Sequence, residues 1–191
     1  MRLGLGLKTR YVLVVAAQLT HPPKGLDLLL RALTFIPAEE RPQLITVGEG
    51  HAKHVDIEVK NLGSIQNEAT LRDAYSAADL LVVPSRNENL PTTIIESLAC
   101  GTPVAAFDVG GISELIEHGE TGHLAAAGDP QSLAEGIRDL LGEPRRLREM
   151  GISARETAKH KFGMDTMVQR YLSMYEEFLQ EKSNPGPQYN P

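Results

Sequence analysis

Short runs of Val, Leu and Ile alternate with longer segments of helical periodicity along most of this 191-residue chain. Strands of a parallel sheet are buried on both faces and read as continuous apolar runs, while the helices between them cover the sheet. The alternation therefore predicts an α/β fold: a single doubly wound parallel sheet of about six strands with helices on both faces. The predicted strands are Tyr11–Ala16, Gln43–Val47, Val59–Leu62, Leu80–Pro84, Val104–Phe107 and His123–Ala125.

Capping and first-turn residues indicate where several of the connecting helices begin. One helix is expected to begin near Lys24, and another has Asp129 as its cap and Pro130 in its first turn. The last clear helix, Asp165–Gln180, has an apolar stripe on one side that needs a partner surface. The stripe consists of Val168, Tyr171, Leu172, Tyr175, Phe178 and Leu179.

The chain is predicted to hold one domain. With 41% hydrophobic residues it can bury one substantial core, which we place at residues 11–182. Residues 1–10 are Gly-rich and basic and are interpreted as an N-terminal extension or linker remnant. Residues 183–191 are rich in Pro, Asn and Gly, and this composition predicts a disordered tail.

Charge and cysteine content exclude several classes of protein. A net charge of -6 and a pI near 5.5 argue against nucleic-acid binding, which requires clusters of Lys and Arg. Cys100 is the single cysteine, so an intrachain disulfide is impossible and a reducing, cytoplasmic setting is expected. The start of the chain lacks the apolar core of a signal peptide, and no later apolar run reaches about 18 residues. A spanning segment is therefore not expected, whereas peripheral attachment to a membrane stays open.

The chemistry is expected after the strand that ends at Pro84. That strand runs into a loop, and a helix is predicted to begin at Pro91, so its amino end lies at the carboxyl edge of the sheet, where ligands bind. The free amides and the dipole of such a helix favour an anion. Glu88 in the loop and Glu96 inside the helix would repel phosphate, because a carboxylate only accepts hydrogen bonds. Both are therefore expected to bind hydroxyl groups, such as those of a sugar or a ribose.

Lys24 is a second candidate at the same edge. It follows the first strand and is predicted to open the first helix, where an ammonium group can neutralise a diphosphate. Taken alone, such a lysine is more simply read as a solvated surface residue.

The run E-N-L-P-T-T-I-I-E, followed by S-L-A-C-G-T-P-V-A-A-F-D-V-G-G-I-S-E-L-I, resembles the E-x7-E signature of the family 4 (group 1) retaining glycosyltransferases of the GT-B fold. The resemblance extends from Val12 to about Leu141, through K-G-L-D-L-L-L-R-A-L, V-G-E-G, L-G-S-I-Q-N and A-A-D-L-L-V-V-P-S. Enzymes of this family have two Rossmann-like domains with the active site in the cleft between them. The chain resembles the C-terminal, donor-binding domain, which is one half of a GT-B fold.

The resemblance implies a role for each glutamate of the motif. The first contacts hydroxyls of the transferred sugar and the second contacts the ribose, here Glu88 and Glu96. Backbone amides between them hold the sugar and the diphosphate, and the nucleobase lies against the loop after the third strand. The implied donor-binding residues are Gln18, Lys24, Gly25, Ile65, Asn67, Glu88, Asn89, Leu90, Thr92, Thr93 and Glu96.

Two positions depart from the family pattern. Many members have Gly-Phe-Gly after the first glutamate, where this chain has Asn-Leu-Pro, and this variant weakens the assignment of the sugar. The family also places an Arg and a Lys on the diphosphate; Lys24 matches the Lys, but the Arg position is occupied by Gln18 or is absent. Arg86 either compensates for the missing charge or is a solvated loop residue.

Retaining transfer in this family is thought to need no enzyme nucleophile, since the acceptor attacks the face that the nucleoside diphosphate leaves. Lys24 and Glu88 are the expected catalytic residues, and Lys24 together with the helix start near Thr92 would stabilise the departing phosphate. No metal or other cofactor is expected. The acidic triplet 56–58 is interpreted as solvated, and the glycine pair at 110–111 is ranked as structural first.

The expected substrate is a nucleotide-diphosphate sugar, and the acceptor is expected on an absent N-terminal domain or partner chain. The chain is then inactive or weakly active alone. In the family the terminal helix crosses onto that N-terminal domain, so the stripe on helix 165–180 would be partly bare here, and self-association through it is a hypothesis. Two alternatives remain open: a non-catalytic nucleotide-sugar-binding or regulatory module, and a sugar-nucleotide epimerase of similar two-domain fold.

Overall fold

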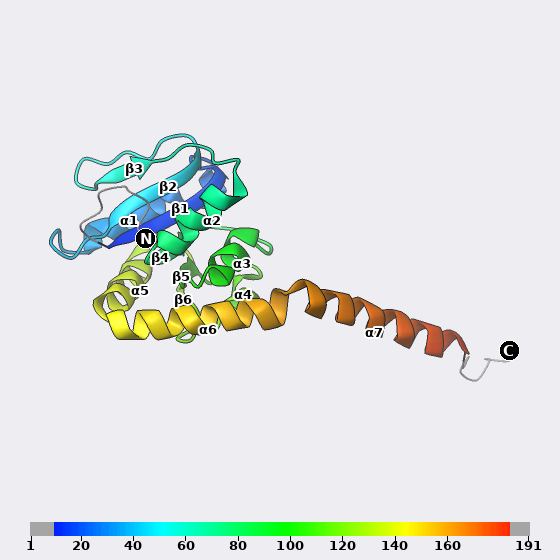
Figure 1. Cartoon of the computed structure of the whole chain (residues 1–191). Coiled ribbons are helices and arrows are strands. Elements are labelled where there is room, and N and C mark those ends of the chain that lie inside the picture. Colours follow the sequence, from blue (N-terminus) through cyan, green and yellow to red (C-terminus); the bar gives the residue numbers. More distant parts are fainter. Residues whose placement is uncertain (1–9, 184–191) are drawn as a thin grey trace, which may run out of the picture.

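The computed structural model describes residues 10–183, which form a six-stranded, all-parallel sheet surrounded by helices (Figure 1). The strand order is β3-β2-β1-β4-β5-β6. The doubly wound α/β fold predicted from the sequence is confirmed, and every predicted strand is present. The strands are β1 (Tyr11–Gln18), β2 (Gln43–Glu49), β3 (Val59–Asn61), β4 (Leu80–Val83), β5 (Val104–Phe107) and β6 (Gly122–Ala125).

Of the helix starts predicted near Lys24, Pro91 and Pro130, the structure confirms the last, and the other two helices begin one or two residues later. Asp129 accepts a hydrogen bond from a first-turn amide of its helix, as predicted. The first helix differs, because Lys24 lies in a short 3-10 turn and Gly25, with a φ of 66°, separates this turn from the helix proper. Pro91 precedes its helix instead of opening it. The helices are η1 (Pro22–Lys24), α1 (Leu26–Phe35), α2 (Glu68–Ala77), α3 (Thr92–Ala99), α4 (Ile112–Leu115), α5 (Pro130–Gly142), α6 (Pro144–Phe162) and α7 (Met164–Ser183).

Alternate residues of β1 point into two apolar clusters, one on each face of the sheet. Val12 and Val14 belong to the cluster covered by α1 and α5, and Tyr11 and Leu13 belong to the cluster covered by α2, α3 and α4. Because β1 is buried on both faces, it reads as an unbroken apolar run in the sequence.

The last two helices behave differently. α6 packs along the body, whereas α7 extends away from it (Figure 1), and the apolar stripe expected on this helix is exposed to solvent. The predicted tail starts at Ser183, which is the last residue of α7; its remainder, like residues 1–9 of the predicted extension, lies outside the described residues. In the described part of the chain, no helix combines the length and the apolar character needed to cross a membrane.

The sheet topology creates a natural ligand site between β1 and β4. From β1 the chain winds outward through β2 to β3, and it then returns to the other side of β1 to place β4. The connections that follow β1 and β4 therefore diverge over opposite faces of the sheet. In doubly wound folds, the crevice at the carboxyl ends of two such strands is where ligands bind.

Candidate functional site

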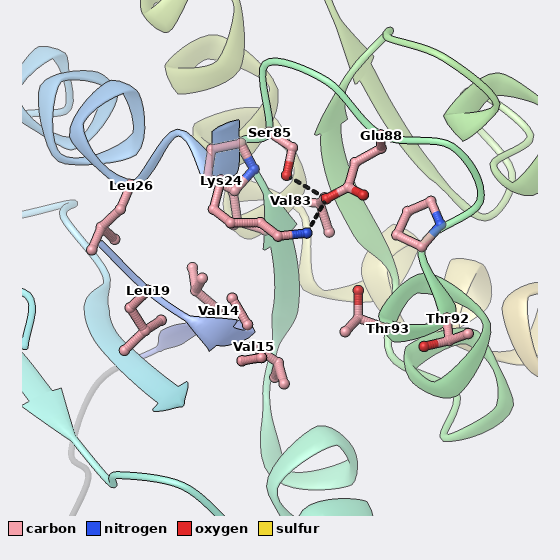
Figure 2. A pocket seen from close by; sticks show the side chains of 15 residues that line it. Val14, Val15, Leu19, Lys24, Leu26, Val83, Ser85, Glu88, Thr92 and Thr93 are labelled. Atoms are coloured by element: carbon pink, nitrogen blue, oxygen red, sulfur yellow. Dashed lines mark hydrogen bonds and ion pairs between the residues drawn. The ribbon is translucent and has the colours of Figure 1, made fainter. Parts of the chain in front are cut away.

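A cavity of about 190 Å³ opens at the carboxyl ends of β1 and β4, and we call it the β1/β4 cavity. Its wall is partly apolar, with Val14 and Val83 contributed by the two strands (Figure 2). Polar side chains come from the elements that follow those strands. They include Lys24 from η1, Ser85 and Glu88 from the loop after β4, and Thr92 and Thr93 from α3. Two stretches of the chain that are far apart in the sequence, residues 14–26 and 82–93, thus meet at this point.

Lys24 and Glu88, the two residues predicted to be catalytic, form an ion pair inside the cavity. The Lys24 Nζ atom lies 2.7 Å from the Glu88 Oε1 atom, and the Ser85 hydroxyl donates a hydrogen bond of 2.8 Å to the same oxygen. The Glu88 side chain is only 13% exposed. Within residues 10–183 both donors use Oε1, so Oε2 remains available to a hydroxyl donor from a ligand.

Gly25 brings Lys24 within reach of Glu88, which is 64 residues away in the sequence. A Cβ atom at Gly25 would lie 1.8 Å from the carbonyl oxygen of Pro84, at the end of β4. Only glycine permits this approach, and it also accepts the left-handed φ that lets α1 begin directly after η1. The structure therefore gives Gly25 a role in positioning the cavity wall.

The amino end of α3 points at the same cavity. Thr92 and Thr93 line the cavity, and no side chain caps this end of the helix. The first amides of a helix have no partner within the helix and carry partial positive charge. This end of α3 can therefore bind a phosphate group next to Lys24.

The glycine pair Gly110–Gly111 supports the loop that carries Glu88. A Cβ atom at Gly110 would lie 1.8 Å from the carbonyl oxygen of Glu88, and the φ of Gly110 is 56°. The Gly111 amide donates a hydrogen bond of 2.9 Å to the carbonyl oxygen of Asn89. Gly110 and Gly111 thus have a structural role, which was the preferred interpretation of the sequence. They support the backbone of the loop that carries Glu88.

Glu96 has a partner that sequence reasoning missed. The phenol of Tyr75, in α2, donates a hydrogen bond of 2.7 Å to Glu96 Oε2, in α3. Burial raises the pKa of Tyr75, and the hydrogen bond to Glu96 and the charge of Glu96 raise it further, so the phenol stays protonated. No sequence motif links these residues, which lie 21 positions apart on different helices.

Arg86 lies at the surface, where its guanidinium group pairs with the carboxylate of Asp27. This hydrogen-bonded pair lowers the pKa of Asp27. Arg86 is not part of the β1/β4 cavity wall, and its charge is paired with Asp27, which fits the interpretation of Arg86 as a solvated loop residue.

The other predicted donor-binding residues lie outside the wall of this cavity, and their roles stay predictions. Gln18 is the exposed last residue of β1. Asn67 caps α2 by accepting a hydrogen bond from its first turn, and Ile65 packs against the cluster beneath α2 and α3. Leu90 and Asn89 lie in the loop before α3, with Leu90 half exposed.

Metal-binding side chains do not gather anywhere in residues 10–183: no three His, Cys, Asp or Glu side chains lie close enough together to hold an ion. The polar groups of the β1/β4 cavity instead combine one ammonium group, one carboxylate, three hydroxyls and the amides of a helix end. Such a set can bind a ligand that has both phosphate and hydroxyl groups.

Comparison with known sequences shows which family the chain resembles. Residues 10–143 match a protein family described as glycosyl transferases group 1. The D-inositol 3-phosphate glycosyltransferase of Thermobispora bispora is 35% identical over an alignment of 205 residues, gaps included. The alignment covers 97% of this chain and 47% of that protein. The N-acetyl-alpha-D-glucosaminyl L-malate synthase of Bacillus anthracis is 31% identical, over 84% of this chain and 44% of its own length. The chain spans about half the length of these relatives.

Solved structures share the fold. The sucrose-phosphate synthase of Thermosynechococcus elongatus superimposes with a TM-score of 0.75 at 28% identity, over 90% of this chain and 46% of the other. Anabaena HepE, solved in complex with UDP, superimposes with a TM-score of 0.75 at 26% identity, over 88% of this chain and 49% of its own.

Proposed function

The chain belongs to the group 1 glycosyltransferases, and from that premise we propose that it forms the donor-binding half of a retaining hexosyltransferase. The proposed ligand is a nucleotide-diphosphate sugar, held in the β1/β4 cavity. UDP is the nucleotide we favour, because HepE has been solved with UDP and with UDP-glucose.

The observation that carries this proposal is the Lys24–Glu88 ion pair beside the uncapped start of α3. An ammonium group has three donors, so Lys24 can keep its contact with Glu88 and still bind a phosphate oxygen. The amides near Thr92 and Thr93 would bind the same diphosphate. Glu88 Oε2 would then accept a hydrogen bond from a hydroxyl of the sugar, next to the bond that breaks.

Stabilising the leaving group is the main task of this half of the enzyme. When the bond to the sugar breaks, negative charge develops on the departing diphosphate. Lys24 and the end of α3 both face the β1/β4 cavity, where that charge would develop, and removing one such donor typically slows a reaction by roughly 10²- to 10³-fold. We propose that this chemistry needs neither a metal ion nor another cofactor.

The acceptor is proposed to bind to a second half that is absent from this chain. The chain spans about half the length of its relatives, and the polar groups of the β1/β4 cavity are those that a diphosphate and a sugar of the donor would need. We therefore expect the isolated chain to bind a nucleotide sugar and to transfer it weakly or not at all.

Calorimetry with UDP, GDP, ADP and UDP-glucose, each in the presence of EDTA, tests the proposal. UDP and UDP-glucose should bind, and chelation should leave their affinity unchanged. Lys24→Met should weaken the binding of UDP at least tenfold, since it removes a charged hydrogen bond. Glu88→Gln should weaken the binding of UDP-glucose more than the binding of UDP. Lys53→Met is the matched control, because Lys53 is an exposed lysine outside the cavity wall.

Two outcomes would count against the proposal. Failure of all four ligands to bind the wild-type chain would overturn the donor-binding function. Binding that Lys24→Met and Glu88→Gln leave unchanged would place the ligand elsewhere and would favour a non-catalytic binding module.

A further inference from the structure

Tyr75 and Glu96 form a contact between a buried donor and an exposed acceptor. Tyr75 is 1% exposed, and its phenol lies 2.7 Å from the Oε2 atom of Glu96, which stands on the solvent side of α3. A free glutamate side chain at a surface samples several rotamers. Here one carboxylate oxygen is held by a group that cannot move without repacking the core.

The backbone of Tyr75 is fixed as well. Its carbonyl oxygen accepts a hydrogen bond of 2.7 Å from the hydroxyl of Thr102, a fully buried residue just beyond the end of α3. Thr102 is held in turn by Ser97, whose hydroxyl donates to the Thr102 carbonyl oxygen. Tyr75 thus has two hydrogen bonds to this part of the chain, one to Glu96 in α3 and one to Thr102 just after it.

Glu96 lies one turn further along α3 than the residues that line the β1/β4 cavity. It follows Thr92 and Thr93 by four and three residues, so it shares their face, one turn or about 5.4 Å further along. Thr92 and Thr93 line the cavity at the end of the helix that favours phosphate. In a nucleoside diphosphate, the ribose is the group that follows the phosphates.

We propose that Tyr75 is a positioning residue for the nucleotide: by holding Oε2 of Glu96, it orients Oε1 to accept a hydrogen bond from a ribose hydroxyl. This inference rests on the proposed donor-binding function. The ribose contact of Glu96 is what the family resemblance implies, and the new element is Tyr75, which acts on the nucleotide without touching it.

The test compares UDP with its 2′-deoxy and 3′-deoxy analogues by calorimetry. The wild-type chain should bind UDP about tenfold or more tightly than at least one analogue, the ratio expected for a hydrogen bond to a charged group. Tyr75→Phe keeps the buried ring and removes the donor. This substitution should weaken the binding of UDP about 3- to 10-fold and leave the affinity for that analogue unchanged. The ratio of the two affinities should therefore decrease. Glu96→Gln should shrink the same ratio.

A stability control separates positioning from a merely structural effect. Thr102→Val removes the other hydrogen bond of Tyr75 without touching Glu96. It should lower the melting temperature as Tyr75→Phe does, yet preserve the ratio between UDP and the deoxy analogue.

The outcomes are distinct. A wild-type chain that binds no nucleotide overturns the proposed function itself. A wild-type chain that binds UDP and both analogues equally, or a Tyr75→Phe variant that keeps the full ratio, overturns the positioning role and leaves the proposed function standing.

Discussion

Arg86, in the loop after β4, donates hydrogen bonds of 2.8 and 2.5 Å to the two carboxylate oxygens of Asp27, in the first turn of α1. The same guanidinium group donates to the carbonyl oxygen of Pro22, and the Arg86 amide donates to that of Pro23. Arg86 therefore ties the loop that carries Glu88 to the turn that carries Lys24.

Arg86→Gln should loosen this link between the two loops. We expect UDP affinity to fall about 2- to 5-fold, while the free energy of unfolding falls by less than about 1 kcal/mol, because the ion pair with Asp27 is exposed. Calorimetry and urea denaturation measure the two effects. Arg145→Gln removes an exposed ion pair on α6, outside the cavity wall, and should change only stability. Equal UDP affinity in both variants would contradict the coupling.

Gly110→Ala should damage both stability and donor binding. Alanine at a left-handed φ costs about 1 to 2 kcal/mol by itself, and here its Cβ atom would also meet the carbonyl oxygen of Glu88 at 1.8 Å. Gly128→Ala is the matched control, since Gly128 has a φ of 68° and open space around it. Urea denaturation should give a larger loss for Gly110→Ala, and UDP affinity should fall only in that variant. Equal losses of stability would mean that the loop simply moves away.

The environment of His123 is expected to make the stability of the fold depend on pH. Its ring packs on Gly136 of α5, where an added Cβ atom would lie 2.2 Å from the ring. Burial lowers the pKa of His123 below its ordinary value of 6.5, and the neighbouring ring of His118, 4.9 Å away, lowers it further. Arg146 acts in the same direction, and the nearby carboxylates, Asp139 and Glu135, oppose it.

The folded state therefore favours the neutral form of His123. Well above pH 6.5 this histidine is neutral in both the folded and the unfolded state and has no effect on the pH dependence of stability. As the pH falls through 6.5 toward the lowered pKa, the unfolded state binds the proton first, so the free energy of unfolding should decrease. Urea denaturation between pH 7.5 and 5 should show a shallower decrease for His123→Gln than for the wild type. His51→Gln is the exposed control, and an unchanged slope for His123→Gln would refute the assignment.

The apolar stripe of α7 should make the isolated chain self-associate. Tyr171 and Phe178, one heptad apart, are 53% and 56% exposed, and the described part of the chain covers neither of them. Sedimentation velocity should show a sedimentation coefficient that rises with concentration. The double variant Tyr171→Ser and Phe178→Ser should remain monomeric, whereas Gln169→Ser should behave like the wild type. A wild-type chain that stays monomeric at high concentration would rule out this association.

The strands could be predicted because parallel strands are buried on both faces. β4 and β5 read as unbroken apolar runs for that reason. The end of β4 in turn indicated where the loop that carries Glu88 begins. The start of α1 was missed because a 3-10 turn and a helix have similar sequence signals, and only the left-handed φ of Gly25 separates them.

Contacts between distant residues could not be predicted from local patterns. Lys24 and Glu88 were each identified from their own loops, but their ion pair depends on the close approach of Gly25 to the end of β4. Tyr75 was missed because an aromatic residue on the buried face of a helix looks like ordinary core. Its phenol matters only because the fold places Glu96 beside it.

α6 determines where this domain could be cut for experiments. It contributes Leu147 and Met150 to the cluster beneath α1 and α5, and Ala154 and Ala158 to the opposite cluster. The match to the family ends at residue 143, immediately before this helix. A fragment truncated at that point would uncover apolar surface on both sides of the sheet at once, so a minimal expressible unit has to extend at least to Phe162.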